Sequence, residues 1–140
     1  MNLLDFLRRA GDMSVKAACR EGHCGACMVL LDGRPRNACL LLAEQVRGAE
    51  VSTAGSLAGD PVREAVVRAL VDEGAPQCGY CTPGVVVTLV GAVRRGVEPS
   101  EVDEVLSAHH CRCSGYYALR RAAHRVLAEA ADVVEEGVAQ

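Results

Sequence analysis

The sequence predicts an α+β protein in which a small mixed unit of one helix and one β-hairpin precedes about four helices. Three observations predict it. A tight-turn signal at residues 32–33 lies between two short apolar runs, helix-start signals stand at residues 60–61 and 82–83, and residues 116–135 repeat apolar side chains at helical spacing. The length of 140 residues suits one ordinary domain or two very small ones.

The N-terminal elements are a short helix and a hairpin. Apolar side chains at helical spacing predict a helix over residues 2–10. The runs at residues 28–31 and 38–42 are apolar and flank Asp32-Gly33, a dipeptide typical of hairpin turns. We therefore expect these two runs to pair, with a loop lengthened by the residues that follow the turn.

The second half begins with two helices that carry similar start signals. Asp60 can cap a helix whose first residue is Pro61, and the apolar residues that follow form one face. Thr82 and Pro83 repeat this signal. We expect a helix from there to about Arg95, although three successive valines favour a strand.

Two further helices and a linker complete the predicted organisation. Ser100 and Asp103 resemble a capping box, which predicts a helix to about Ala108. Residues 116–135 predict one long final helix. A segment rich in small and polar residues places a boundary near residues 52–60, which divides the chain into units 1–55 and 60–140.

Charge and composition exclude several classes of function. The chain has 15 basic and 18 acidic residues, and only 3% of its residues are aromatic. Without a basic stripe or aromatic platforms it does not fit a nucleic-acid binder. No apolar run approaches the length of a membrane span, and no signal-peptide core follows Arg8-Arg9. We therefore expect a cytoplasmic protein with no nucleic-acid partner and no membrane span.

Eight cysteines form two groups of four with short spacings, which indicates metal binding rather than a disulfide scaffold. The first group is Cys19, Cys24, Cys27 and Cys39. Its Cys-x4-Cys-x2-Cys spacing with a distant fourth cysteine matches plant-type [2Fe–2S] sites. Gly22 and Gly25 let the loop backbone approach the inorganic sulfides, so that its N–H groups can donate to sulfur.

The second group is Cys78, Cys81, Cys111 and Cys113. Paired cysteines also suit zinc, so the spacing alone leaves zinc and iron–sulfur open, although the Cys-x-Cys pair is tighter than the usual zinc pair. Proline and glycine residues after the pairs place both at helix starts. Free N–H groups and the helix dipole would stabilise an anionic cluster there.

Three segments carry a family resemblance: Cys-Arg-Glu-Gly-His-Cys-Gly-Ala-Cys at 19–27, Gln-Cys-Gly-Tyr-Cys-Thr-Pro-Gly at 77–84 and Cys-Arg-Cys-Ser-Gly-Tyr at 111–116. They resemble the small iron–sulfur subunit of the molybdenum hydroxylases, a family that includes xanthine dehydrogenase, aldehyde oxidoreductase and aerobic carbon monoxide dehydrogenase. The resemblance extends from about Leu3 to Ala128 and accounts for all eight cysteines in order.

The resemblance implies a fold, cofactors and partners. The fold would be a plant-ferredoxin-like β-grasp domain followed by a four-helix bundle, with one [2Fe–2S] cluster in each. Electrons would leave a molybdopterin centre in a large molybdopterin-binding subunit and pass through both clusters to FAD in a medium subunit or to another acceptor. The second cysteine group would lie nearer molybdenum and the first nearer flavin. Gln77 and Cys113 match positions that approach the pterin, and no residue of this chain is expected to be catalytic.

The chain departs from the family pattern at three places. The family starts earlier, with a β-hairpin that is missing here; we expect a start codon assigned too late rather than a gap covered by a partner. Arg20 stands where the family has glycine, and a left-handed backbone would be strained there. His109 and His110 stand just before Cys111, and we expect them to lie beside the cluster or at the surface rather than to bind iron.

Two other functions remain open from the sequence. One is a free-standing ferredoxin-type carrier with a helical zinc domain, which metal analysis would distinguish. The other is an iron–sulfur redox sensor that acts through a partner. Molybdenum and flavin in a purified complex would exclude the sensor.

Overall fold

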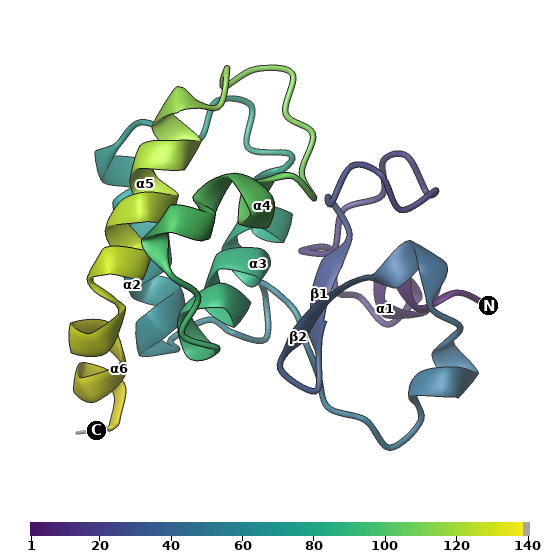
Figure 1. Cartoon of the computed structure of the whole chain (residues 1–140). Coiled ribbons are helices and arrows are strands. Elements are labelled where there is room, and N and C mark those ends of the chain that lie inside the picture. The colour runs from purple at the N-terminus through teal and green to yellow at the C-terminus, as the bar shows by residue number, and fades with distance from the viewer. Residues whose placement is uncertain (139–140) are drawn as a thin grey trace.

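The structure is a computed structural model that describes residues 1–138, and in it a small sheet lies beside a group of helices (Figure 1). The N-terminal elements are α1 (Leu3–Arg9), β1 (Met28–Leu31), β2 (Arg34–Asn37) and β3 (Val51–Ser52), with 3-10 turns at Ala38–Leu40 and Ala43–Val46. The helices are α2 (Pro61–Asp72), α3 (Thr82–Arg94), α4 (Val102–Leu106), which follows a 3-10 turn at Pro99–Glu101, α5 (Tyr117–Ala128) and α6 (Ala130–Val138). The prediction of a mixed unit followed by helices is confirmed.

The hairpin forms at the predicted turn, but its second strand is not where the sequence placed it. Asp32 and Gly33 both have positive φ, as a two-residue turn requires, and Leu31 pairs directly with Arg34. The polar segment Arg34–Asn37 is therefore the edge strand β2, on one side of β1, with β3 on the other. The prediction that residues 38–42 form the strand is wrong, because a two-residue turn leaves no room for a longer loop.

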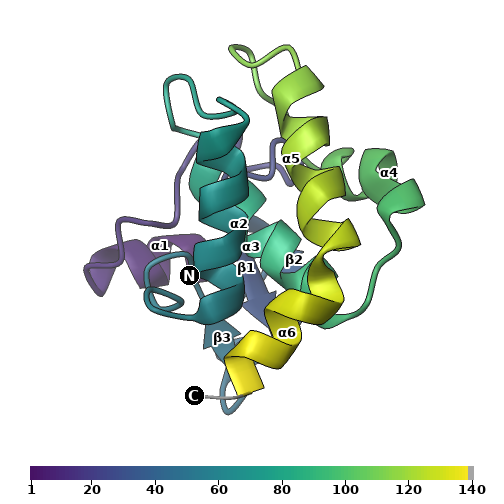
Figure 2. The same cartoon turned by 90° about the vertical axis from the view of Figure 1, so that its left-hand side faces the viewer.

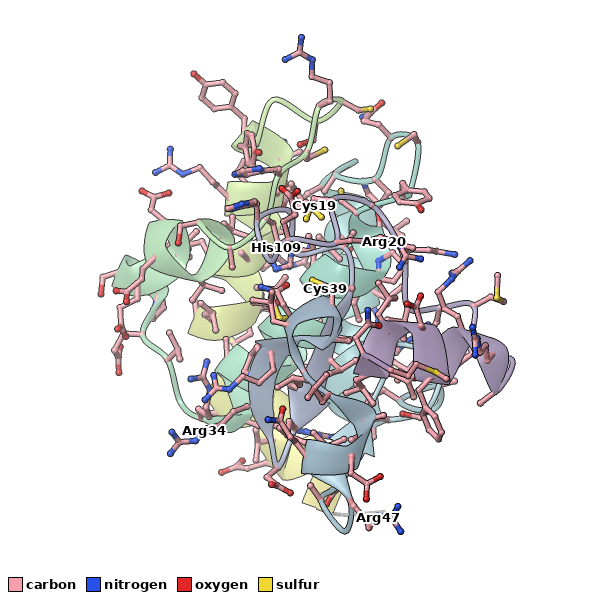
Figure 3. The ribbon with its side chains drawn as sticks, turned by 90° about the vertical axis from the view of Figure 1, so that its right-hand side faces the viewer. Cys19, Arg20, Arg34, Cys39, Arg47 and His109 are labelled. Atoms are coloured by element: carbon pink, nitrogen blue, oxygen red, sulfur yellow. The ribbon has the colours of Figure 1, made fainter. Side chains whose placement is uncertain are left out.

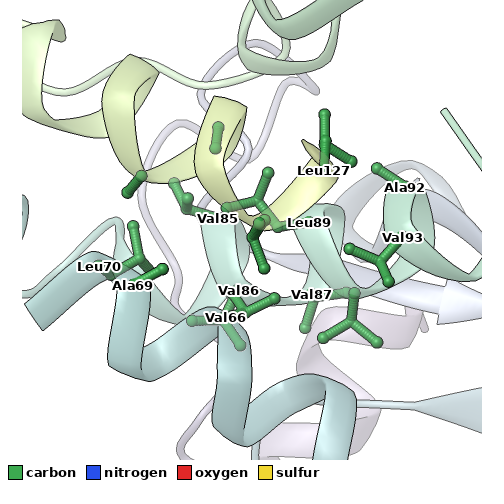
Figure 4. Close-up of a cluster of buried hydrophobic side chains, with 14 of the residues drawn as sticks. Val66, Ala69, Leu70, Val85, Val86, Val87, Leu89, Ala92, Val93 and Leu127 are labelled. Carbon is green, nitrogen blue, oxygen red and sulfur yellow. The ribbon is translucent and has the colours of Figure 1, made fainter. Parts of the chain in front are cut away.

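Helix α3 lies between the N-terminal sheet on one side and α2 and α5 on the other (Figures 1 and 2). Its run from Val85 to Val93 is almost completely buried, and its valines pack against α2 and α5 (Figure 4). This explains why three successive valines form a helix here: burial against two other helices outweighs their weak helix propensity. The predicted helix from Thr82 is confirmed, and so is the one capped by Asp60, whose carboxylate accepts from the Arg63 amide at 3.0 Å.

One face of α3 is made of small residues and lies against the N-terminal unit. A Cβ atom added to Gly84 would stand 2.2 Å from the carbonyl oxygen of Gly25, and one added to Gly91 would stand 2.8 Å from a methyl group of Leu30. Only glycine allows such an approach of the helix backbone. The helix that leads away from Cys81 is thus packed directly on the loop of the first cysteine group.

Two predictions for the last helices are wrong. The capping box of Ser100 and Asp103 does not form: α4 begins at Val102 without a side-chain cap, and the Glu98 amide instead donates to the Glu101 carboxylate at 3.0 Å. The long final helix is broken at Glu129 into α5 and α6. Figure 2 shows that α6 turns away from the axis of α5, and it lies against α2.

The segment between the sheet and α2 is pinned to the N-terminal unit. The Thr53 hydroxyl donates to the Asp12 carboxylate at 2.6 Å, and the Gly55 amide donates to the Ser14 hydroxyl at 2.9 Å. Thr53 is 3% exposed. The predicted linker is therefore folded against the loop that follows α1.

Among residues 1–138, the helices are all too short or too polar to cross a membrane.

Candidate metal centres

The first cysteine group is assembled from one long loop and one short turn. Cys19, Cys24 and Cys27 lie in the loop that joins α1 to β1, and Cys39 lies in the 3-10 turn that follows β2 (Figure 3). The end of the hairpin holds the loop, because the Asn37 side-chain amide donates to the Gly22 carbonyl at 3.0 Å. The Ala38 amide also donates to the Cys27 carbonyl at 3.2 Å, so the end of the edge strand positions Cys39 beside the loop.

The thiols of this group lie against one another in pairs. Backbone N–H donation, chiefly from Glu21, lowers the pKa of Cys19 to about 6, and the neighbouring Cys24 thiol acts in the same direction. Burial raises the pKa of Cys27 to about 12, and the adjacent Cys39 thiol adds to this effect. The loop thus directs backbone N–H donors toward Cys19, while Cys27 and Cys39 are buried.

The second group is built where two helices begin. Cys78 and Cys81 lie at the start of α3, with Cys81 at its N-cap, and Cys111 and Cys113 lie in the segment that leads into α5. Burial raises the pKa of Cys81 to about 12, and the Cys111 thiol beside it acts in the same direction. The Cys78 thiol raises the pKa of Cys113. The four thiols therefore also meet as two pairs. Cys81 lies at a helix start as predicted, whereas Cys111 and Cys113 lie in the segment that precedes Tyr116, the N-cap of α5.

The donor set fits a two-iron cluster. Among residues 1–138, no three cysteine, histidine or acidic side chains lie where they could hold one metal ion. Instead, each group offers two pairs of thiols, and all eight cysteines are free of disulfides. Four thiolates are the ordinary ligand set of a [2Fe–2S] cluster. The residues present therefore fit two such clusters, and binding must displace the protons that burial keeps on Cys27 and Cys81.

The two groups meet at a shared junction. The backbone amide of His110 donates to the carbonyl of Cys24 at 3.1 Å. Next to it His109 is 2% exposed, and its Nε2 lies 2.7 Å from the hydroxyl of Thr88 on α3. His109 thus lies against the loop of the first cysteine group, while His110 has an exposed side chain.

Two tyrosines support the junction, and neither was predicted from the sequence. The Cys111 amide donates to the Tyr116 hydroxyl at 2.8 Å, and this hydroxyl in turn donates to the His109 carbonyl at 3.2 Å. The Tyr80 hydroxyl donates to the Ala17 carbonyl at 2.6 Å. Both tyrosines lie within the cysteine motifs. Their position next to cysteines in the sequence is the feature from which a role at this junction could have been predicted.

Gln77 and Arg20 were also singled out from the sequence. Gln77 is exposed and its amide donates to the carbonyl of Gly74 at 3.3 Å, so its approach to a pterin stays a prediction. Arg20 has φ 61°, as expected from a position where glycine is usual, and its guanidinium lies 2.9 Å from the Asp5 carboxylate. The ion pair ties the strained residue to α1.

Two family models match the chain. A 2Fe-2S iron-sulfur cluster binding domain matches residues 1–58, and a [2Fe-2S] binding domain matches residues 53–124. Together these segments contain all eight cysteines. The second model includes the cysteine group for which the spacing had left zinc open.

Curated relatives and solved structures are similar over most of the chain. A probable subunit of xanthine dehydrogenase from Bacillus subtilis is 37% identical over 91% of this chain and 75% of its own length. The nicotinate dehydrogenase small FeS subunit of Eubacterium barkeri is 37% identical over 86% of this chain and 78% of its own. Quinoline 2-oxidoreductase of Pseudomonas putida 86 matches with a TM-score of 0.81 at 33% identity, over 94% of this chain and 85% of that one. Aldehyde oxidoreductase of Desulfovibrio desulfuricans matches with a TM-score of 0.83 at 34% identity, over 95% of this chain but 15% of that one.

Proposed function

This chain belongs to the small iron–sulfur subunits of the molybdenum hydroxylases, and we propose that its eight cysteines hold two [2Fe–2S] clusters in series. The first cluster is held by Cys19, Cys24, Cys27 and Cys39, and the second by Cys78, Cys81, Cys111 and Cys113. As a member of this family the chain is the electron-transfer subunit of an oxidoreductase. Its clusters work with molybdopterin and FAD that belong to partner subunits.

The observation that carries the proposal is the convergence of the thiols in pairs. Each [2Fe–2S] cluster, when bound, accepts and releases one electron at a time. Each pair would hold one iron: Cys19 with Cys24 and Cys27 with Cys39 in the first group. In the second group they are Cys81 with Cys111 and Cys78 with Cys113. Two thiolates on each of two irons complete the cluster.

The protein supplies positive potential where the clusters bring negative charge. The Glu21 amide donates to the Cys19 sulfur at 3.4 Å, and the Ser114 amide donates to the Cys111 sulfur at 3.3 Å. Although burial opposes it, hydrogen bonding from Ser114 holds the pKa of Cys111 below its usual value. Hydrogen bonds to ligand sulfur raise the reduction potential of a cluster by offsetting its charge.

The two groups differ in exposure, and this supports an order of electron flow. Cys78 and Cys113 are exposed, whereas Cys27 and Cys39 are buried. An exposed rim beside the second group suits a docked large subunit, and Gln77 on the same rim would approach its pterin. Electrons would then pass from a large molybdopterin-binding subunit through the second centre and the first to FAD in a medium subunit.

The finer description of the fold belongs to the same proposal. We take residues 1–55 as a ferredoxin-like β-grasp unit without its first hairpin, and residues 60–140 as a unit built on a four-helix bundle. Residues 139–140 lie outside the described part. The proposed location is the cytoplasm. A zinc site in the second unit is not favoured, since a [2Fe-2S] binding domain matches residues 53–124, and nothing favours a redox sensor over the family function.

Metal analysis and electron paramagnetic resonance (EPR) test the proposal. The full chain should hold about four irons and no zinc, and after reduction it should give two distinguishable signals. Cys24→Ser should remove one signal and Cys113→Ser the other, with the remaining signal unchanged in each case. Two irons with one zinc, or a single signal in the unchanged protein, would contradict the proposal.

A further inference from the structure

A buried histidine stands between the two cysteine groups without being a ligand in either. His109 is 2% exposed, its Nε2 lies 2.7 Å from the Thr88 hydroxyl, and its Nδ1 has no hydrogen-bond partner. The ring faces Gly25, where an added Cβ would stand 2.3 Å from Nδ1. The imidazole therefore fills the space directly over the loop between Cys24 and Cys27.

The ring of His109 is held at one nitrogen only. Nε2 lies at hydrogen-bond distance from the Thr88 hydroxyl on α3, while Nδ1 faces Gly25 without a hydrogen-bond partner. The imidazole, held at Nε2 by α3, therefore acts as a rigid spacer between the helix and the loop.

The segment 109–110 is held by hydrogen bonds to two other parts of the chain. On one side the His110 amide donates to the Cys24 carbonyl at 3.1 Å, and on the other the Tyr116 hydroxyl donates to the His109 carbonyl at 3.2 Å. One hydrogen bond therefore links a residue of the first group to the chain that enters Cys111.

We propose that His109 is a positioning residue that holds the Cys24 loop against the segment leading to Cys111 and thereby sets the electronic contact between the two centres. From Cys24 the route crosses the hydrogen bond to His110 and continues through covalent bonds to Cys111. The transfer needs no proton or co-reactant, since one electron lost by one centre is gained by the other. The inference rests on the proposed assignment of the cysteines to two clusters.

The magnetic interaction between the two reduced centres measures this contact. The full chain, loaded with both clusters and fully reduced, should show splitting of its EPR signals by the neighbouring spin. His109→Ala removes the spacer, so the splitting should be lost while the iron content stays at that of the unchanged protein. His109→Gln, which restores a side-chain N–H near the position of Nε2, should bring much of the splitting back.

His110→Ala is the matched control, because it removes an exposed imidazole one residue away and keeps the backbone amide that donates to Cys24. It should leave the splitting unchanged. Thr88→Val removes the partner of Nε2 with little change in side-chain volume, and it should weaken the splitting. If His109→Ala does not bind its full complement of iron, the splitting measured in Thr88→Val tests the inference in its place.

The outcomes separate this inference from the proposed function. Full iron content with unchanged splitting in His109→Ala would overturn the inference, as would the same result in Thr88→Val if His109→Ala does not fold. An equal loss in His110→Ala would also overturn it. Failure of the unchanged chain to bind four irons or to give two signals would instead overturn the proposed function.

Discussion

The hydroxyl of Tyr80 donates a 2.6 Å hydrogen bond to the backbone carbonyl of Ala17, which joins two loops that are 63 residues apart in the chain. Tyr80 lies between Cys78 and Cys81, and Ala17 lies two residues before Cys19. The ligand loops of the two groups are therefore tied together by a side chain here, in addition to the backbone contact between His110 and Cys24. Loss of this tie should loosen the junction without removing a ligand.

Replacing Tyr80 by phenylalanine should lower the free energy of unfolding by about 0.5–1.5 kcal/mol, the usual net value of one hydrogen bond. The lower end is expected because Tyr80 is 47% exposed. Urea unfolding of the cluster-loaded chain measures the change. Tyr117→Phe, at a side chain that is 75% exposed, should change it by less than about 0.5 kcal/mol. Equal losses in both variants would contradict the role of the Ala17 contact.

Local chemistry made the helix starts and the cysteine loops predictable. Asp60 with Pro61 predicted α2, and the structure shows the Asp60 carboxylate accepting from Arg63. The spacing of Cys19, Cys24 and Cys27 likewise predicted one wrapping loop, since cluster ligands must come from a short stretch of backbone. Both signals act within a few residues, where the sequence determines the structure directly.

The features that were missed depend on contacts between distant segments. Nothing in the sequence near Glu129 marks the end of α5, because no glycine or proline stands there. The edge strand Arg34–Asn37 is polar, so its hydropathy gave no strand signal, and the apolar run after it was preferred. The buried state of His109 depends on Thr88 and Gly25, which only the packing of α3 on the first loop brings together.

The strained backbone at Arg20 predicts which of two substitutions at this position gives the more stable protein. At φ 61° an L-residue with a Cβ is disfavoured by about 1–2 kcal/mol, whereas glycine is not. Arg20→Ala and Arg20→Gly both remove the ion pair with Asp5, so they differ only in the backbone. Arg20→Gly should therefore be the more stable variant by about 1 kcal/mol in urea unfolding.

Arg9 provides the opposite control. It is exposed in the last turn of α1, where the backbone is helical and alanine is favoured over glycine by up to about 1 kcal/mol. Arg9→Gly should therefore be less stable than Arg9→Ala. If glycine is the less stable choice at both positions, the conformation of Arg20 does not carry the strain assigned to it.

Asp12 should make the stability of the N-terminal unit depend on pH. Although partial burial opposes it, hydrogen bonds from Ser14 and Thr53 hold the pKa of Asp12 below its usual value. A lowered folded-state pKa contributes stability above the unfolded-state pKa of about 3.9, and this contribution is lost as the pH falls through the folded-state value. Asp12→Asn should therefore destabilise the chain by about 1–2 kcal/mol at pH 7.

The difference between Asp12→Asn and the unchanged chain should shrink as the pH is lowered below about 4, because the carboxylate of the unfolded chain is protonated first and the native carboxylate follows as the pH falls through its lowered pKa. Thermal unfolding at several pH values measures it. Glu50→Gln is the control: its exposed carboxylate accepts no hydrogen bond within residues 1–138, so its effect should be small at every pH. A deficit in Asp12→Asn that is constant between pH 3 and pH 7 would show that the carboxylate charge is not involved.

Gly84 tests how closely the helical half must approach the first cysteine loop. In an isolated helix, alanine would be favoured over glycine by about 1 kcal/mol, but here the new Cβ would meet the Gly25 carbonyl oxygen at 2.2 Å. Backbone cannot yield as a side chain can, so Gly84→Ala should destabilise the chain by about 1–3 kcal/mol and alter the EPR signal that Cys24→Ser removes. At Gly91 the nearest atoms belong to the side chains of Leu30 and Pro35, and Gly91→Ala should cost less and leave that signal unchanged. Because both glycines lie on the same helix, a reversed ranking would mean that the loop of Cys24 moves more freely against α3 than the contact at Gly25 implies.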